Sequence, residues 1–476
     1  MTRKMELPKE PFELTITGLS SHAEGVGRYE GKVIFVDGAL PGERCKIRVI
    51  HNGRKMARAV VTEILESSPD RIYPPCPYYK DCGGCQFQHY TYEKQLEYKR
   101  QTVQDALRHI GNLELEPNQV IGGEPYAYRN KMLFPLAVYE NRIAASLHPR
   151  NSYNKLTPLG NCMLLEKPLQ ELLEQSVNCL NQVFAPEDVY DYETRTGNLR
   201  YISLRSFAEK QILILVMREF QEDKVKILDT FWSKIPGWSG TVVYESPDIN
   251  EYEWGIRPPK YISGQRTFEI PFKEITGYVQ PLTFLQTNTK MANKLYEHVL
   301  NLPFSVKEVL LDGYCGIGLL SLVLANEFQF VIGIDSDENA ITSAKYSAQQ
   351  LHLDNVYFLK APVEHALRIF ANPLVTNPKP LHPTVESMAQ ETLGKLGNRK
   401  ITTVILDPPR AGCHPKVIKR LGEIQPQDII LISCHPATLA RDLSGLISLG
   451  YKPLSVQPFD LFPQTFHVET VVHLRK

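Results

Sequence analysis

The stretch VKEVLLDGYCGIGLLSLVLA, residues 306–325, decides the fold class of this 476-residue chain. It runs from an apolar segment typical of a buried strand, through a glycine-rich turn, into a segment typical of a helix. Gly313, Gly316 and Gly318 permit positive φ angles and a close approach of a ligand to the backbone. A second strand then ends in Asp335, where an acid binds ribose hydroxyls in doubly wound α/β folds. The pattern favours a nucleoside ligand over a mere tight turn.

Two later strands bring reactive side chains to the same edge of the predicted sheet. LDPPRAG, residues 406–412, places Asp407 at the end of one strand, before two prolines that stiffen the turn. LISCHPATLARD, residues 431–442, places Cys434 at the end of the next strand. Ligands of open α/β sheets bind outside the carboxyl ends of the strands. Although most buried cysteines only pack, Cys434 is therefore a candidate nucleophile.

These motifs share one order with two more, FLQTN at 284–288 and FPQTFHVETV at 462–471. Together they resemble the S-adenosylmethionine-dependent RNA 5-methyluridine methyltransferases, of the type that has a TRAM domain and an iron–sulfur cluster and modifies 23S rRNA. The resemblance covers essentially the whole chain. It implies that Cys434 is the nucleophile and Glu469 the general base. It also implies that S-adenosylmethionine is bound by Gln286, Tyr314, Asp335 and Asp407.

The chain departs from the better-known pattern of this family in three places. Asp335 stands where Glu is common, which gives a shorter arm for the same ribose contact. Leu319 stands where some members have a polar residue on the cofactor side. Residues 371–400 are rich in Pro, Asn, Thr and Lys and predict an inserted, disordered loop. These differences concern the cofactor geometry rather than the reaction.

The chemistry of uracil requires such a pair of residues. C5 is a poor nucleophile, but a thiolate that adds to C6 creates an enolate whose C5 can take a methyl group. A base must then remove the C5 proton so that the thiolate can leave. Covalent catalysis of this kind divides one difficult step into two, and a positioned carboxylate contributes roughly 10²–10⁴-fold. Glu469 lies in an alternating strand, where an exposed strand residue is the alternative, and His467 is left unassigned.

Four of the nine cysteines are predicted to bind metal. Cys76, Cys82 and Cys85 form a C-x5-C-x2-C pattern in a segment rich in Gly, Pro and Tyr, and such a loop can wrap thiolates around one ion or cluster. Thiolate ligation suits zinc or a [4Fe–4S] cluster, and the spacing does not separate the two. The resemblance implies [4Fe–4S], with Cys162 as the fourth ligand. Its expected role is to fold the domain and position RNA.

The N-terminal residues 8–66 predict a separate all-β unit. Short alternating strands with glycine turns suit an OB-like barrel that binds oligonucleotides, and the segment resembles a TRAM domain. The formal net charge of the chain is zero, which argues against a basic binder overall. A local run of basic residues nevertheless predicts a face that contacts phosphates: Arg44, Lys46, Arg48, Arg54, Lys55 and Arg58.

The length suggests about three domains. We expect a TRAM domain at 8–66, a central α/β domain with the cluster loop at 67–275, and a Rossmann-like methyltransferase domain at 276–476. In the central domain, Arg129, Asn130 and Lys131 match a family segment that faces RNA. No run approaches ~18 apolar residues, and the start lacks a signal segment, so we expect a cytoplasmic monomer without membrane association.

The expected reaction is methylation of a uridine at C5 in RNA, with 23S rRNA as the substrate. A tRNA uridine-C5 methyltransferase and a non-catalytic iron–sulfur RNA-binding protein are the alternatives. An amino-methylating enzyme of this fold would need an aromatic residue after the prolines, where Arg410 stands. A radical enzyme with a TRAM domain would show C-x3-C-x2-C in place of the observed spacing.

Overall fold

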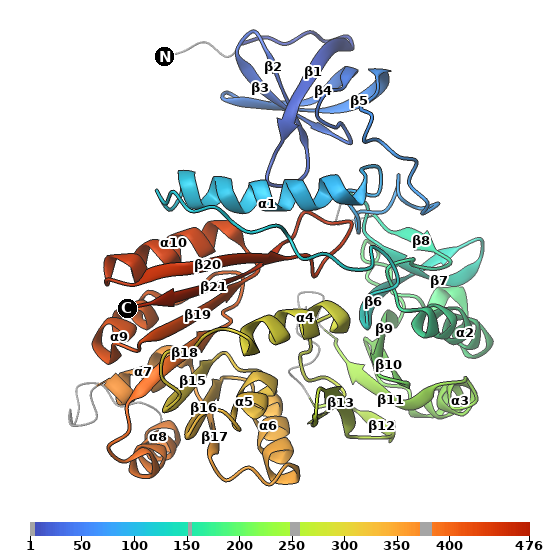
Figure 1. Cartoon of the computed structure of the whole chain (residues 1–476). Coiled ribbons are helices and arrows are strands. Elements are labelled where there is room, and N and C mark those ends of the chain that lie inside the picture. Colours follow the sequence, from blue (N-terminus) through green and yellow to red (C-terminus); the bar gives the residue numbers. More distant parts are fainter. Residues whose placement is uncertain (1–4, 151–154, 248–257, 372–382) are drawn as a thin grey trace.

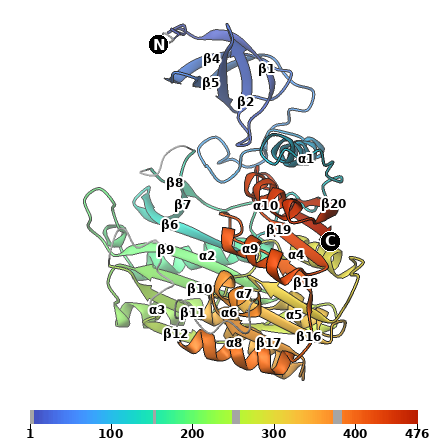
Figure 2. The ribbon, with the colours of Figure 1, turned by 90° about the vertical axis from the view of Figure 1, so that its left-hand side faces the viewer.

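The computed structural model describes residues 5–150, 155–247, 258–371 and 383–476. Figure 1 shows a small barrel at the top, a long helix beneath it, and two α/β units side by side below. The barrel remains above both units when the molecule is turned by 90° (Figure 2), and it contacts the long helix, where the Tyr98 hydroxyl donates to the carbonyl of Ser20 at 2.8 Å.

The N-terminal unit is a closed five-stranded barrel with strand order β1-β2-β3-β5-β4. Side chains alternate between the barrel interior and solvent, and the inward ones, such as Ile16, Ile34 and Ile47, are at most 1% exposed. The predicted OB-like barrel is confirmed. Its strands are β1 (Phe12–Leu19), β2 (Gly25–Tyr29), β3 (Lys32–Asp37), β4 (Arg44–Asn52) and β5 (Met56–Glu66).

The basic face of the barrel is less positive than its local sequence suggests. Three of its six basic residues form ion pairs with acids from other parts of the barrel: Arg44 with Glu13 and Glu66, Lys46 with Glu63, and Arg58 with Glu24. Glu43, the one acid inside the run, is buried and pairs with Arg71. The sequence around the basic run does not reveal these acidic partners, because strand pairing brings them from distant positions.

The central unit is a seven-stranded sheet in the order β12-β11-β10-β9-β6-β7-β8. Strands β9 and β10 pair antiparallel as a hairpin. Two helices, α2 and α3, pack on this sheet, and Trp232 is fully buried between them. The elements are α1 (Tyr92–His109), β6 (Lys131–Tyr139), β7 (Arg142–Leu147), β8 (Thr157–Leu159), α2 (Lys167–Val183), η1 (Pro186–Asp188), β9 (Leu199–Phe207), β10 (Lys210–Met217), α3 (Glu222–Trp232), β11 (Trp238–Glu245) and β12 (Tyr261–Gly264). A two-stranded sheet follows, β13 (Phe268–Phe272) with β14 (Ile275–Val279).

The C-terminal unit is a doubly wound sheet in the order β17-β16-β15-β18-β19-β21-β20. The five strands from β17 to β19 run parallel, whereas β21 is antiparallel to both of its neighbours. The strands are β15 (Val309–Gly313), β16 (Phe330–Asp335), β17 (Val356–Lys360), β18 (Ile401–Leu406), β19 (Asp428–Ser433), β20 (Lys452–Phe459) and β21 (Glu469–Arg475). The helices are α4 (Thr289–Leu300), α5 (Leu319–Leu324), α6 (Glu338–Gln350), α7 (Val363–Ala371), α8 (Pro383–Leu396), α9 (Pro415–Ile424) and α10 (Pro436–Ser448).

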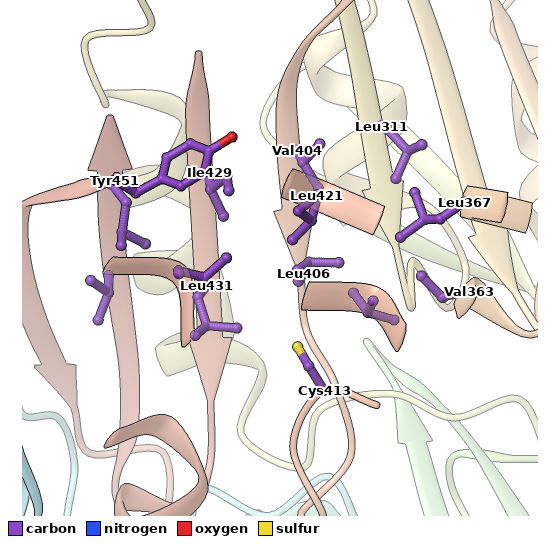
Figure 3. Packing of buried hydrophobic residues seen from close by; sticks show 14 of the residues in the cluster. Leu311, Val363, Leu367, Val404, Leu406, Cys413, Leu421, Ile429, Leu431 and Tyr451 are labelled. Carbon is purple, nitrogen blue, oxygen red and sulfur yellow. The ribbon is translucent and has the colours of Figure 1, made fainter. Parts of the chain in front are cut away.

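The core of this unit lies between the parallel strands and the helices that cover them. Figure 3 shows Leu311, Leu406 and Leu431 on three strands facing Val363 and Leu421 on α7 and α9. Burial of each such side chain contributes roughly 1.5–3 kcal/mol, so the sheet is a rigid platform for the loops at its edge.

The inserted segment is not a loop throughout, contrary to expectation. Residues 383–396 form α8, and residues 372–382 lie outside the described part of the chain. Ala389, Leu393 and Leu396 recur at helical spacing and pack against α7 and the adjoining core. The polar composition of the segment concealed this apolar stripe. Among the described residues, no helix combines the length and the apolar character needed to cross a bilayer.

Candidate active site

A cavity of about 670 Å³ opens at the edge where the parallel strands end. All six residues predicted as catalytic or cofactor-binding line it: Gln286, Tyr314, Asp335, Asp407, Cys434 and Glu469. The antiparallel direction of β21 explains why Glu469 lies at this edge. Because Ser433 pairs with Thr470, the end of β19 and the start of β21 meet at this edge.

The glycine turn forms the floor of the cavity. Gly316 and Gly318 have φ angles of 55° and 72°, and a Cβ on Gly318 would lie 2.5 Å from a ring carbon of Phe358. Gly313 does not take a positive φ, which corrects the expectation for this residue; Tyr314 does so instead, at 64°. Gly313 still closes β15, where the Leu406 side chain leaves little room for a Cβ.

Asp335 is fixed beside this turn by backbone donors. Its carboxylate accepts hydrogen bonds from the amides of Gly316, at 2.8 Å, and Asp337, at 2.9 Å. A carboxylate has about four acceptor positions, so two remain for donors of a ligand. The predicted spacing of turn and acid is therefore realised as direct contact between them.

The central domain holds the FLQTN segment on the opposite side of the cavity. Asn130 is buried and donates to the carbonyl of Gln286 at 2.9 Å, and the ammonium of Lys131 donates to the carbonyl of Leu285 at 2.6 Å. The expectation that Asn130 faces RNA is wrong, because its side chain is buried and its amide group donates a hydrogen bond inside the protein. Lys131 does line the cavity and lies 4.2 Å from the ring centroid of Phe284.

Cys434 lies between the end of β19 and the first turn of α10. Burial and, to a smaller extent, the neighbouring Glu469 raise the pKa of its thiol to about 11, whereas Arg410 opposes the shift. The N-terminus of a 13-residue helix carries a partial positive charge that favours a thiolate. The raised pKa favours the protonated thiol, whereas the Arg410 guanidinium and the N-terminus of α10 both favour the thiolate.

Glu469 has the character of a base held out of water. Its side chain is 3% exposed, and among the described residues its Oε1 has no hydrogen-bond partner. Burial raises its pKa well above the usual range, and the charge of Asp407 acts in the same direction. Burial likewise raises the pKa of Asp407 to about 7. A carboxylate with a raised pKa is a stronger base once it is ionised, which is the property that a proton acceptor in this cavity would need.

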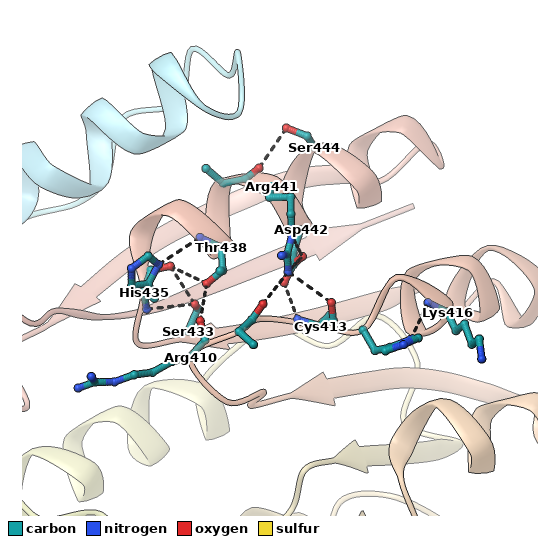
Figure 4. A network of polar contacts seen from close by, with 12 residues as sticks. Arg410, Cys413, Lys416, Ser433, His435, Thr438, Arg441, Asp442 and Ser444 are labelled. Atoms are coloured by element: carbon teal, nitrogen blue, oxygen red, sulfur yellow. Dashed lines mark hydrogen bonds and ion pairs between the residues drawn. The ribbon is translucent and has the colours of Figure 1, made fainter. Parts of the chain in front are cut away.

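A polar network fastens the Asp407 loop to α10 (Figure 4). Asp442 accepts from the amide of Cys413 at 2.7 Å and from the guanidinium of Arg441. Gly412 sits in this network with a φ of 78°, where a Cβ would lie 2.4 Å from Arg441 Nη2. Arg410 projects out of the network and donates to His467 Nε2 at 3.2 Å. Sequence reasoning gave Arg410 and Asp442 no role, although both lie inside the motifs that it used.

The four cysteines predicted as metal ligands line a second cavity, of about 580 Å³: Cys76, Cys82, Cys85 and Cys162. Lys131 and Thr287 border both cavities, so the two are neighbours. Within the described part of the chain, no three His, Cys, Asp or Glu side chains are arranged to hold a single metal ion. The structure thus brings the four thiols to one cavity without forming the tight tetrahedron of a zinc site, in which Zn–S bonds are about 2.3 Å.

Two protein families match different parts of the chain, and related proteins match nearly all of it. The TRAM domain matches residues 10–62, and the tRNA (Uracil-5-)-methyltransferase family matches residues 265–476. An "Uncharacterized RNA methyltransferase" of Clostridium tetani is 30% identical, over 97% of this chain and 95% of its own length. A protein of the same description from Caldanaerobacter subterraneus is 32% identical, over 97% of each chain.

A solved structure covers the same span. The Pyrococcus abyssi tRNA (uracil-54, C5)-methyltransferase, in complex with S-adenosyl-L-homocysteine, has a TM-score of 0.71 and 25% sequence identity. The alignment covers 97% of this chain and 100% of that one. The fold and the cavity define a methyltransferase of the α/β class that uses S-adenosylmethionine. The chain belongs to the RNA methyltransferases, and it combines an N-terminal TRAM domain with a C-terminal domain of the tRNA (uracil-5-)-methyltransferase family.

Proposed function

We propose that this enzyme methylates C5 of a uridine in RNA through a covalent bond between the sulfur of Cys434 and C6 of the base. The observation that carries the proposal is the meeting of Cys434 and Glu469 in one cavity, from adjacent antiparallel strands. A nucleophile and a base on the same cavity wall are what addition to C6 and removal of the C5 proton require.

The remaining wall is proposed to hold the cofactor. Asp335 would take the ribose hydroxyls, and Gln286, Tyr314 and Asp407 would contact the rest of the molecule. S-adenosylmethionine supplies the methyl group from a sulfonium centre. The cavity suits such a positively charged ligand, because Asp312, Asp335 and Asp407 line it and their mutual repulsion adds to the raised pKa of Asp407.

The protein residues then carry the proton and electron movements. The Cys434 thiolate, favoured by Arg410 and the N-terminus of α10, bonds to C6 and makes C5 nucleophilic. After C5 has taken the methyl group, Glu469 removes the C5 proton. The electron pair of that C–H bond restores the C5–C6 double bond and expels the thiolate. Among the described residues, none donates a hydrogen bond to Oε1 of Glu469, so this oxygen is available to accept the proton.

We also propose that Cys76, Cys82, Cys85 and Cys162 hold a [4Fe–4S] cluster. The support is a cavity lined by all four thiols, three of which come from the C-x5-C-x2-C segment. A cubane cluster takes one thiolate at each of its four irons, which matches the number of thiols. Its role would be structural, since the cysteine segment contacts the active-site loop, as shown below.

Protein purified without oxygen is therefore expected to contain about four iron and four sulfide per chain and to absorb broadly in the visible range. Iron and sulfide analysis together with metal analysis checks this. Cys179→Ala is the matched control, because this half-buried cysteine lies on α2, outside both cavities, and should leave the iron content unchanged. Stoichiometric zinc without sulfide would reject the cluster.

For the RNA substrate, we propose 23S rRNA on the basis of the sequence resemblance. Transfer RNA is the second candidate, favoured by the likeness to the Pyrococcus abyssi tRNA (uracil-54, C5)-methyltransferase over the full length of that chain. The TRAM barrel supports RNA binding in either case. The target base must leave its stack, which costs a few kcal/mol and is easiest in a loop.

The test is methylation by the purified protein of unmodified 23S rRNA and unmodified tRNA, in parallel reactions with S-adenosylmethionine. Nuclease digestion and mass spectrometry should reveal 5-methyluridine in one of the two RNAs and none with heat-denatured protein. A methyl group found on a ring nitrogen, an exocyclic amine or a ribose oxygen would contradict C5 chemistry.

A further inference from the structure

The segment that leads into Glu469 is held by the central domain from several sides. Residues 460–468 connect β20 to β21, and two of them, Phe462 and His467, line the active-site cavity. The residues that hold this connection come from α1 and from the cysteine-rich segment. Figure 1 shows α1 lying across the methyltransferase domain, alongside α10 and β20.

The main contact is a buried ion pair between Lys99, in the middle of α1, and Asp460. Both side chains are fully buried. The Lys99 ammonium also donates to the carbonyl of Phe462 at 3.0 Å, and the amide of Phe462 donates to Asp460 Oδ1 at 3.2 Å. Thus the ion pair fixes both polar groups of the Phe462 backbone.

A second contact lies one helical turn earlier on α1. Gln95 and Gln464 form two hydrogen bonds with each other. The side-chain Nε2 of Gln95 donates to Oε1 of Gln464 at 3.1 Å, and the backbone amide of Gln464 donates to Oε1 of Gln95 at 3.2 Å. Gln464 has a φ of 68°, a left-handed conformation that persists only where its surroundings impose it. The amides of Gln86 and Phe87, next to Cys85, donate to the Gln464 carbonyl at 2.8 and 3.1 Å.

Stability alone does not explain a charged pair at this place. Burying an ammonium and a carboxylate carries a large desolvation cost, and apolar side chains of similar volume often serve as well or better. The ion pair adds directional hydrogen bonds, which hold the backbone of Phe462 in a single position. Neither Lys99 nor Gln95 lines the active-site cavity.

We propose that Lys99 and Gln95 are positioning residues, which hold the 460–468 connection from α1 so that Glu469 reaches C5 of the bound uridine. This inference rests on the proposed function. It assigns to the central domain a direct part in proton removal. Lys99 and Gln95 themselves contact neither the cofactor residues nor Cys434, so cofactor binding and thiol addition should depend on them less than proton removal does.

The test uses Lys99→Met/Asp460→Asn, which removes both charges, keeps both volumes and retains an acceptor for the Phe462 amide. Near-ultraviolet circular dichroism verifies the fold. We expect kcat to fall about 10²-fold, as for a small displacement of a catalytic group. The KM for S-adenosylmethionine should stay unchanged, and a denaturant-stable protein–RNA adduct should accumulate because its release is slowed.

Asp428→Asn is the matched control. Asp428 is equally buried, and it accepts from His473 and Arg475 at 2.8 Å at the far end of β19 and β21. This variant should lower the melting temperature yet keep the wild-type kcat, with no accumulated adduct. Gln95→Met is the second test variant, since it removes amide hydrogen bonds without stranding a charge. It should show the same pattern to a smaller extent, and it decides the matter if the double variant does not fold.

The inference is overturned if either folded test variant keeps kcat within about twofold of wild type, or loses activity without accumulating adduct. Failure of the proposed function gives a different result, because the wild-type protein itself would then form no 5-methyluridine and no adduct. An active wild type beside unimpaired variants would leave the function intact and remove only the positioning role.

Discussion

Cys434→Ala is expected to abolish methylation, by about 10⁴-fold or more, as loss of a covalent nucleophile does elsewhere. The reason is that C6 needs a soft nucleophile, and without addition C5 remains too weak to accept the methyl group. Cys315 also lines the cavity, but burial raises the pKa of its thiol well above the usual value, so it is a poor substitute for Cys434. The measurement is transfer of labelled methyl groups to RNA under single-turnover conditions. The variant should still bind S-adenosylmethionine, because its contacts lie on other strands.

Cys413→Ala is the control for this variant. Cys413 lies in the loop after β18, and its side chain packs in the hydrophobic core (Figure 3). Its replacement removes a thiol near the site but costs only a small cavity, so activity should stay close to wild type. Appreciable turnover by Cys434→Ala would show that the reaction does not proceed through this sulfur.

Glu469→Gln is expected to fail at a later step. The variant retains the thiol and the cofactor residues, so addition and methyl transfer can proceed, but the C5 proton has no acceptor. Product release should slow by roughly 10²–10⁴-fold, the usual contribution of a positioned base. A protein–RNA adduct that carries the methyl group should then accumulate and survive a denaturing gel.

The fold should not suffer from this change, which separates a catalytic effect from a structural one. A buried carboxyl whose pKa is raised costs stability as the pH rises above its value in the unfolded chain, about 4.3. Glutamine keeps the shape of the neutral acid and removes that cost at neutral pH. The melting temperature of Glu469→Gln should thus equal or exceed that of wild type. Normal turnover without adduct would move the role of base to another residue, with His467 the first to test.

The part of the site that lies on parallel strands was predictable from sequence. Strand, turn and acid recur in order, and parallel strands all end at one edge, so Asp335, Asp407 and Cys434 had to come together. The return of β21 was not predictable in this way, because its antiparallel direction depends on long-range pairing with β19. Glu469 was assigned from family resemblance, and the structure supplies the physical reason for its place.

Long-range partners also account for what sequence reasoning missed. Lys99 and Asp460 are 361 positions apart, and a lone lysine in an amphipathic helix predicts a solvated side chain rather than a buried one. The acids that pair with Arg44, Glu13 and Glu66, come from positions outside the basic run. The apolar stripe of α8 was hidden by the polar residues around it. For the lysine and the basic run, the contact that changed the meaning of the local pattern was distant, whereas the α8 stripe is a local pattern that the composition of the segment obscured.

The central claim, a covalent bond between Cys434 and C6, has one direct measurement. RNA that carries 5-fluorouridine at the target position has no C5 proton to remove, so the wild-type enzyme cannot release it. After incubation with S-adenosylmethionine, nuclease and protease digestion followed by mass spectrometry should find a methylated fluorouridine nucleotide on the peptide that contains Cys434. RNA with ordinary uridine should leave far less of it, and Cys434→Ala none. Methylation of ordinary RNA by the wild type, with no adduct on this peptide from fluorinated RNA, would contradict the account.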